Sequence, residues 1–242
     1  MATHISRHLY SVGNRVACVC SRGMESAQVL ATELDCGAVD DPALVPTNAD
    51  FYLLAVPDRF IPEVAARLPK VEGMVLHCAG AVAMGVLGSH AEAHGVLYPL
   101  QTLSRDRQVS LGEVPFLLEA SDPKAMEKLR LLASGLSGRI VEVDSDERAM
   151  IHLAAVFANN FSNHMVDIAA RIMEEHQLDF ALLEPILKET FAKMNELGPR
   201  AAQTGPARRG DKESMQKHLD LLKEHPEWQK LYTFVSHNIS DG

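Results

Sequence analysis

The feature that most constrains the fold is an alternation of short apolar runs with helical segments over the first 143 residues. Strands that alternate with helices form βαβ units, in which neighbouring strands are mostly parallel. The predicted strands are 15–20, 51–56, 74–77, 95–97, 115–119 and 139–143, and the predicted helices are 2–12, 24–34, 60–68 and 123–136. We therefore expect an α/β fold with a mostly parallel sheet.

The pattern changes after Asp144. Ser145-Asp146-Glu147 supplies capping and acidic first-turn residues, and a helical period then continues to about His176. Helical character persists to the end of the chain, with breaks at Gly198-Pro199, Gly205-Pro206 and Pro226. We therefore expect a sheet-containing domain over residues 1–144 and an all-helical domain over residues 145–242.

The composition excludes two classes of partner. The 242 residues carry a formal charge of −9, and 47% of them are hydrophobic. No run approaches the roughly 18–20 uninterrupted apolar residues of a membrane span, and the first residues lack an apolar signal-peptide core. Binding to nucleic acid needs a basic surface, which an acidic chain does not favour. We expect a cytoplasmic protein with neither membrane nor nucleic acid as partner.

The cysteines and paired histidines do not predict a metal site. The cysteines are Cys18, Cys20, Cys36 and Cys78. Their spacing suits neither a zinc knuckle nor a C-x-x-C redox pair, so we expect reduced, mostly buried thiols. The histidine pairs at positions 4 and 8 and at positions 90 and 94 have i, i+4 spacing but no third ligand placed by the sequence.

The end of the first predicted strand, Cys20-Ser21-Arg22, suggests a nucleotide contact. In a dinucleotide-binding fold, the residue that ends the second strand contacts the adenosine ribose. The strand 15–20 would have to be the second strand of such a fold. An acidic residue there binds the 2′-hydroxyl of NAD, whereas Ser or Arg suits the 2′-phosphate of NADP. Arg22 can hold such a phosphate through two parallel hydrogen bonds. The alternative is a solvated arginine at a strand end.

Six runs spread over nearly the whole chain carry a family resemblance. They are ATHISRHLYSVGNRVACVCSR (2–22), AVPD (55–58), HCAG (77–80), YPLQT (98–102), HLAAVFANNF (152–161) and QTGPARRGD (203–211). In these runs the chain resembles Rossmann-type NADP or deazaflavin oxidoreductases with a helical C-terminal domain of unknown function. That group is related to pyrroline-carboxylate reductase and phosphogluconate dehydrogenase. The resemblance implies a Rossmann-like sheet, an all-helical C-terminal domain and NADP as cofactor.

The same resemblance implies which residues contact the cofactor. Ser21 and Arg22 would bind the adenosine end, and Ala55, Val56 and Pro57 would lie along the cofactor between adenosine and nicotinamide. Ala79 and Gly80 would allow close backbone approach near the nicotinamide ribose. The alternative is that these are ordinary turns between strands and helices, which small residues and Pro also favour.

The start of the sequence departs from the family pattern. Family members normally have an apolar strand and a G-x-G-N turn just before the helix that begins here at Ala2. The glycines let backbone N–H groups approach the pyrophosphate, and no glycine precedes Ala2. The missing strand would be central, and its five or so apolar side chains would contribute ~7–15 kcal/mol. We expect either a start further upstream or weak dinucleotide binding.

The helix that begins near residue 147 carries a polar stripe. At 100° per residue, His152, Asn159 and Asn163 lie within roughly 40° of one another. Histidine can donate the proton that accompanies hydride transfer, and asparagine can orient a substrate. Asn160 matches the family motif better than Asn159, although it lies roughly 80° from His152. The alternative is a histidine in a polar core network or facing solvent.

The run 203–211 is rich in glycine and charge. A loop of this kind can direct backbone donors and Arg209 toward a substrate carboxylate or phosphate. The alternative is a connector between helices in which Arg209 pairs with Asp211.

These predictions combine into one functional hypothesis. We expect an NADP-dependent oxidoreductase that transfers a hydride between NADPH and a small, anionic carbonyl or imine substrate. His152 would donate the proton or polarise the substrate, the asparagines would orient the substrate, and Arg209 would anchor its acidic group. By analogy with related reductases, we expect a homodimer formed through the helical domain. The rival hypotheses are a non-catalytic NADP(H)-binding sensor and an interaction protein whose nucleotide site is lost.

Overall fold

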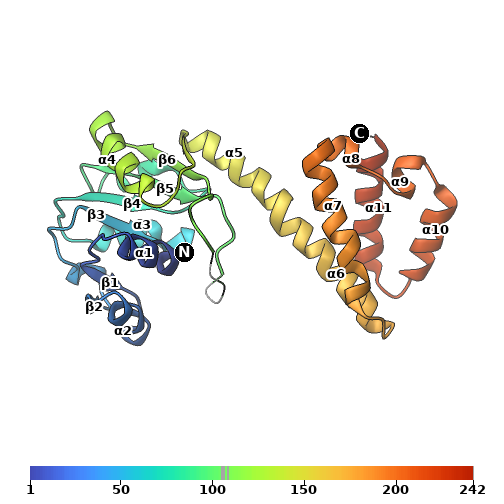
Figure 1. The fold of residues 1–242 in the computed structure, drawn as a ribbon, viewed down its shortest axis with the longest axis horizontal. Helices are drawn as coiled ribbons and strands as arrows, with labels where there is room; N and C mark the ends of the chain where they lie inside the picture. Colours follow the sequence, from blue (N-terminus) through green and yellow to red (C-terminus); the bar gives the residue numbers. More distant parts are fainter. Residues whose placement is uncertain (105–106, 108, 242) are drawn as a thin grey trace. The chain divides into compact units, whose positions relative to one another are not determined.

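The computed structural model describes residues 1–104, 107 and 109–241 (Figure 1). The chain divides into two compact units, Met1–Ala158 and Asn159–Gly242. The expected boundary near residue 145 is where α5 (Ser145–Ala155) begins, and α5 belongs to the first unit. The units therefore divide within one continuous helical stretch rather than at a linker.

The first unit contains two sheets. In the smaller sheet, β1 (Cys18–Cys20) pairs in parallel with β2 (Gly37–Val39). The larger sheet has the order β3-β4-β5-β6-β7. These strands are β3 (Phe51–Leu54), β4 (Met74–His77), β5 (His94–Pro99), β6 (Phe116–Ala120) and β7 (Ile140–Glu142). All pairs in it are parallel except β5–β6, so the predicted mostly parallel sheet is confirmed.

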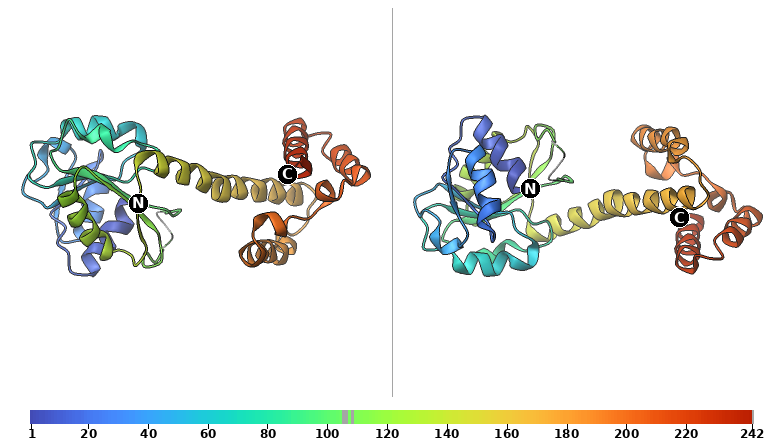
Figure 2. Two further views of the ribbon diagram at one scale, coloured as in Figure 1. Left: turned by 90° about the horizontal axis from the view of Figure 1, so that it is seen from above. Right: turned by 90° about the horizontal axis from the view of Figure 1, so that it is seen from below.

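Helices cover both faces of the larger sheet, as expected for strands that are apolar throughout (Figure 2). On one face, α1 (Ala2–Ser11) and α4 (Pro123–Ser134) form a core with alternate side chains of β4, β5 and β6. On the other face, α3 (Ile61–Arg67) packs on β3 and β4. All four residues of β4 are buried, because the strand is covered on both sides. The smaller sheet is covered by α2 (Met24–Glu33).

A cavity of about 470 Å³ lies between β1 and β3 and is lined by residues of both strands. Within the described chain, no strand pairs with the edges of β1 and β3 that border it. The sheet is therefore split at the position where the family resemblance implies a central strand. All four residues of β3 line the cavity; Phe51 and Leu53 are partly exposed, whereas Tyr52 and Leu54 are buried.

The cavity corrects the expectation that the cysteines are mostly buried. Only Cys78 is buried; Cys20 is exposed, and Cys18 and Cys36 are partly exposed. Cys18 and Cys20 both line the cavity, because β1 borders it instead of lying inside a continuous sheet. All four thiols are free.

The described part of the second unit is helical throughout, as predicted. Its elements are α6 (Ser162–Glu175), η5 (Phe180–Leu183), α7 (Glu184–Leu197), α8 (Pro199–Ala202), α9 (Pro206–Arg209), α10 (Lys212–Leu221) and α11 (Pro226–Asp241). Pro199, Pro206 and Pro226 each begin a helix, because proline is tolerated in the first helical turn. Across the described residues, no helix is both long and apolar enough to cross a membrane.

Candidate active site

A tyrosine and a histidine meet at the carboxyl edge of the larger sheet. Tyr98 lies near the end of β5, and His152 lies in the third turn of α5. Tyr98 Oη and His152 Nδ1 are 2.9 Å apart, and the rings pack edge to face. Ligands of open α/β sheets bind at this edge. The sequence predicted His152 but not Tyr98, although Tyr98 begins the YPLQT run that carried the resemblance.

Gly80, which follows β4, makes room for the histidine ring. A Cβ atom at Gly80 would lie 2.6 Å from His152 Nδ1 and 2.7 Å from Cγ, closer than real Cβ contacts allow. The lack of a side chain at Gly80 is therefore required by the position of His152. Contact of Ala79 and Gly80 with the cofactor stays a prediction.

The surroundings of Tyr98 keep its phenol protonated. Burial raises the pKa of Tyr98, and the negative charge of Asp58 raises it further. Asp58 begins the short helix η2 (Asp58–Phe60) that follows β3. A phenol of raised pKa remains a hydrogen-bond donor at neutral pH, so it can donate to the Nδ1 lone pair of a neutral imidazole.

A second cluster lies beyond the ends of β1 and β3. The Arg22 guanidinium lies 5.0 Å from the centre of the Phe60 ring, and that of Arg59 lies 4.7 Å from it. Neither arginine forms an ion pair with a carboxylate among the described residues. Two cations beside one aromatic ring suit a phosphate attached to a flat ring system. The sequence predicted Arg22; Arg59 and Phe60 were missed, although they directly follow the AVPD run.

The remaining predicted cofactor residues lie at the same edge of the strands. Ser21 follows β1, and its N–H donates to the Val39 carbonyl at 3.2 Å. Ala55, Val56 and Pro57 follow β3 and lead into η2. The structure thus places all seven predicted cofactor residues after β1, β3 or β4.

The start of α1 offers further donors for an anion. Its first turn contains neither a side-chain cap nor an acidic residue. Burial lowers the pKa of the Met1 amine, with a smaller opposing effect of Cys78, which directly follows β4. The helix therefore begins near the carboxyl edge of the sheet, where free N–H groups suit a phosphate. The adenosine-phosphate end of NADP fits this set of residues; a glycine-rich turn ahead of Ala2 is not part of this sequence.

The predicted asparagines lie in an irregular part of the long helix. Val156–Phe161 form a π-helix, and Asn159 and Asn160 lie within it. A π-helix takes more residues per turn than an α-helix, so the uniform 100° rotation used to group His152 with Asn159 and Asn163 does not hold there. The three asparagines are exposed. π-helical turns often mark functional sites, which keeps these residues as candidates.

Arg209 is mostly exposed and lies at the end of α9. Its Nη2 is 4.0 Å from Asp211 Oδ2, the outer limit of an ion pair. Asp211 instead caps α10 by accepting a hydrogen bond from the Ser214 N–H at 3.0 Å. Gly205 and Gly210 adopt positive φ angles of 108° and 67°, which favour glycine. The glycines of the run 203–211 thus shape a connection between helices, while the guanidinium stays available to an anion.

One histidine of each i, i+4 pair contacts a backbone carbonyl. His4 Nε2 lies 2.8 Å from the Ser104 carbonyl, and His94 Nδ1 lies 3.1 Å from that of Ala91. Among the described residues, no three metal-ligating side chains come together.

Two family descriptions match the chain. Residues 1–76 match the family described as NADP oxidoreductase, coenzyme F420-dependent. Residues 114–239, about half of the chain, match the domain of unknown function DUF2520. No functionally curated protein matches the sequence.

Solved structures match almost the entire chain. A candidate NADP oxidoreductase from Bacteroides fragilis is 37% identical, with a TM-score of 0.93, over 100% of this chain and 94% of that one. A protein from Thermotoga maritima is 21% identical, with a TM-score of 0.73, over 99% and 95% of the two chains. An imine reductase from Myxococcus stipitatus, solved with NADP+, is 15% identical, with a TM-score of 0.65, over 100% and 89%. The last two similarities show the fold alone.

Proposed function

Because the chain belongs to the NADP oxidoreductases that carry a DUF2520 domain, we propose that it is a reductase that uses NADPH to reduce a small, anionic carbonyl or imine compound. The observation that carries this proposal is the hydrogen-bonded Tyr98–His152 pair beside Gly80, at the carboxyl edge of the sheet. A reduction of this kind needs a proton donor next to the nucleotide, and the pair supplies one.

We assign the hydrogen-bond donor of the pair to Tyr98, whose raised pKa keeps its hydroxyl protonated. With Nδ1 of His152 as the acceptor, the ring proton lies on Nε2. NADPH, when held there, would supply the hydride for the carbonyl or imine carbon. His152 donates its Nε2 proton to the substrate oxygen or nitrogen while Nδ1 takes the hydroxyl proton of Tyr98, so the ring remains neutral as its other tautomer. Solvent then returns a proton to the Tyr98 phenolate.

The cofactor is held through the ends of the strands. We propose that Arg22 and Arg59 bind the 2′-phosphate while Phe60 packs beside the adenine, because these groups already lie together. Ser21 and the backbone of residues 55–57 line the route toward residues 79 and 80. This arrangement favours NADPH over NADH, since only NADPH carries the 2′-phosphate.

We propose that residues of the helical unit also contact the substrate. We assign Asn159, Asn160 and Asn163 to substrate orientation, because they lie in and after a π-helix. We assign Arg209 to an acidic group of the substrate, because its side chain is 65% exposed and only weakly paired.

We also propose a cytoplasmic homodimer that associates through the helical unit. Among its described residues only Ala207 and Ser236 are buried, while Leu182, Ile186 and Phe234 are 68%, 63% and 69% exposed. So large an exposed apolar surface is typical of an interface. Light scattering after size exclusion should give twice the mass of one chain, and Ile186→Asp should lower the measured mass to that of one chain. A monomeric wild type would contradict the dimer.

The decisive test is a calorimetric titration with NADPH and NADH, followed by a panel of imines and 2-oxo acids. We expect binding of NADPH with a preference of at least about tenfold over NADH, and NADPH oxidation with one substrate class. His152→Ala should abolish most turnover while leaving NADPH affinity within about twofold. Absence of NADP(H) binding would sink the proposal, and binding with no turnover would favour the sensor.

A further inference from the structure

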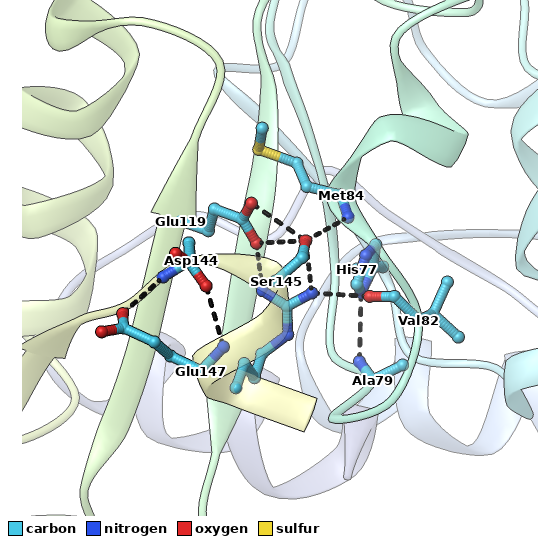
Figure 3. Close-up of polar contacts among 9 residues, drawn as sticks. His77, Ala79, Val82, Met84, Glu119, Asp144, Ser145 and Glu147 are labelled. Atoms are coloured by element: carbon cyan, nitrogen blue, oxygen red, sulfur yellow. Dashed lines mark hydrogen bonds and ion pairs between the residues drawn. The ribbon is translucent and has the colours of Figure 1, made fainter. Parts of the chain in front are cut away.

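A buried polar cluster attaches the start of α5 to the sheet (Figure 3). Arg148, in the first turns of α5, has a side chain that is 0% exposed. Its Nη1 forms an ion pair with Glu119 of β6, and its Nη2 donates to the Val82 carbonyl at 2.6 Å. The cluster therefore joins β6, the segment after β4, and α5.

Ser145, the first residue of α5, completes these connections. Its hydroxyl contacts the two Glu119 carboxylate oxygens at 2.9 and 3.0 Å and accepts the Met84 N–H at 3.0 Å (Figure 3). A capping box formed by Asp144 and Glu147 fixes the first turn. The Glu147 N–H donates to Asp144 Oδ1 at 2.8 Å, and the Asp144 N–H donates to Glu147 Oε2 at 3.0 Å. Little apolar packing supports α5, since Arg148 is its one fully buried residue.

The cluster and the candidate proton donor lie on one face of the sheet. Across the antiparallel β5–β6 pair, Glu119 is opposite Val96 and Leu117 is opposite Tyr98. Opposite residues share a face, as do residues two apart along a strand, so Glu119 and Tyr98 project from the same face. They are diagonal neighbours, which lie about 7–8 Å apart in such pairs.

Two side chains of α5 contact these two residues of the sheet. Arg148 and His152 are four residues apart, so they lie on the same side of α5 and about 6 Å apart along its axis. Arg148 bonds Glu119, and His152 bonds Tyr98. One contact would leave α5 free to rotate or slide, whereas two contacts a turn apart fix both its rotation and its register.

The cluster is poorly explained as a source of stability. Removing an ion pair from water is costly, and buried pairs can often be replaced by apolar residues without loss of stability. Here Arg148 Nε and His77 Nε2 are buried without a hydrogen-bond partner among the described residues. A positioning role accounts for a cluster whose hydrogen bonding is incomplete.

We propose that Arg148, Glu119 and Ser145 are positioning residues that hold His152 against Tyr98 and Gly80. In their absence α5 would lose its register on the sheet, and the proton donor would move relative to the bound nucleotide. Its catalytic consequence rests on the proposed function, but the position of His152 can be measured without any turnover.

The test uses the full chain with 15N-labelled histidine. The imidazole nitrogen chemical shifts report the hydrogen bond at His152 Nδ1, and the His152 signal is assigned by its loss in His152→Gln. Glu119→Gln and Ser145→Ala remove the charge or one hydroxyl of the cluster, and Tyr98→Phe removes the partner directly. Glu142→Gln is the matched control, because Glu142 pairs with Arg130 at an exposed site on the neighbouring strand.

We expect Glu119→Gln to move the His152 shifts toward those of Tyr98→Phe and to lower kcat by roughly 100-fold, with KM and NADPH affinity changed little. Glu142→Gln should leave all of these at wild-type values. Unchanged His152 shifts in a folded Glu119→Gln would overturn the proposal, as would unchanged shifts in Ser145→Ala if Glu119→Gln does not fold. Altered shifts in a protein whose wild type never oxidises NADPH would uphold the positioning role and refute the reductase.

Discussion

Replacing Gly80 by alanine adds a single methyl group at the point where the His152 ring lies. The backbone of Gly80 is not in the left-handed region, so alanine introduces no backbone strain there. The added carbon would lie 2.6 Å from His152 Nδ1, and an ordinary contact begins at 3.4 Å. His152 must therefore retreat by about 0.8 Å, which can lengthen its 2.9 Å hydrogen bond with Tyr98 beyond the usual limit.

Two measurable losses follow from this displacement. Overpacking of a filled site costs about 1–3 kcal/mol, which lowers the melting temperature of a unit this size by about 2–12 °C. A displacement approaching 1 Å in a catalytic group costs up to about 100-fold in kcat. Scanning calorimetry and steady-state NADPH oxidation would measure the two effects on the same preparation.

The controls separate the histidine from other causes. Gly85→Ala lies in the same segment, and its added carbon meets nothing within 4 Å, so it should be neutral. In a His152→Gly background both the ring and the Cβ atom, which would lie 2.9 Å from the added carbon, are gone, and Gly80→Ala should cost little further stability. The reasoning is refuted if Gly80→Ala retains the wild-type melting temperature and kcat, or if its stability cost is the same in both backgrounds.

Four other substitutions test other parts of the structure. Arg22→Ala and Arg59→Ala should each weaken NADPH binding by roughly tenfold in calorimetry and leave NADH binding unchanged, since only NADPH has the 2′-phosphate; equal losses for both nucleotides would contradict this. Tyr98→Phe should lower kcat by roughly 10- to 100-fold at unchanged NADPH affinity, and full activity would remove Tyr98 from the proton relay. Burial and the Arg148 charge lower the pKa of His77 to about 4, against a smaller opposing effect of the Ala83 carbonyl. The unfolded chain therefore binds the proton first on acidification, and about 3 kcal/mol of unfolding free energy present above pH 6.5 should be lost by pH 4. Urea titrations should show this extra loss in the wild type and not in His77→Asn.

Hydropathy along the chain predicts most elements because their core contacts follow local periodicity. β3, β4 and α4 were predicted to within two residues at each end. β2 was missed because three residues beginning with glycine carry no alternation that can be read. The antiparallel direction of β6 depends on how the chain returns to the sheet, which hydropathy does not encode.

The sequence predicted a candidate site residue only where its residue type and its place in a motif indicated one kind of contact. Arg22 and His152 could be identified from their chemistry and their place in a motif. Tyr98 was missed because its partner His152 lies 54 residues away in sequence. Arg59 was missed because only the fold brings Arg22 to the same Phe60 ring. Arg148 was missed because arginine is rarely fully buried, so an arginine in the first turns of a predicted helix does not indicate a buried ion pair.

The cavity between β1 and β3 has a consequence for cofactor affinity. The small sheet and α2 share no strand pairing with the larger sheet in the described chain, and an exposed Arg7–Glu33 ion pair is one of their few ties to α1. Such a segment opens locally at a lower free energy than the five-stranded core, and its amides should exchange with deuterium first. Arg22 lies on this segment, so NADPH can use its guanidinium only in the fraction of molecules in which the segment is closed. The apparent dissociation constant rises as that fraction falls, and bound nucleotide should in turn slow amide exchange across β1, β2 and α2.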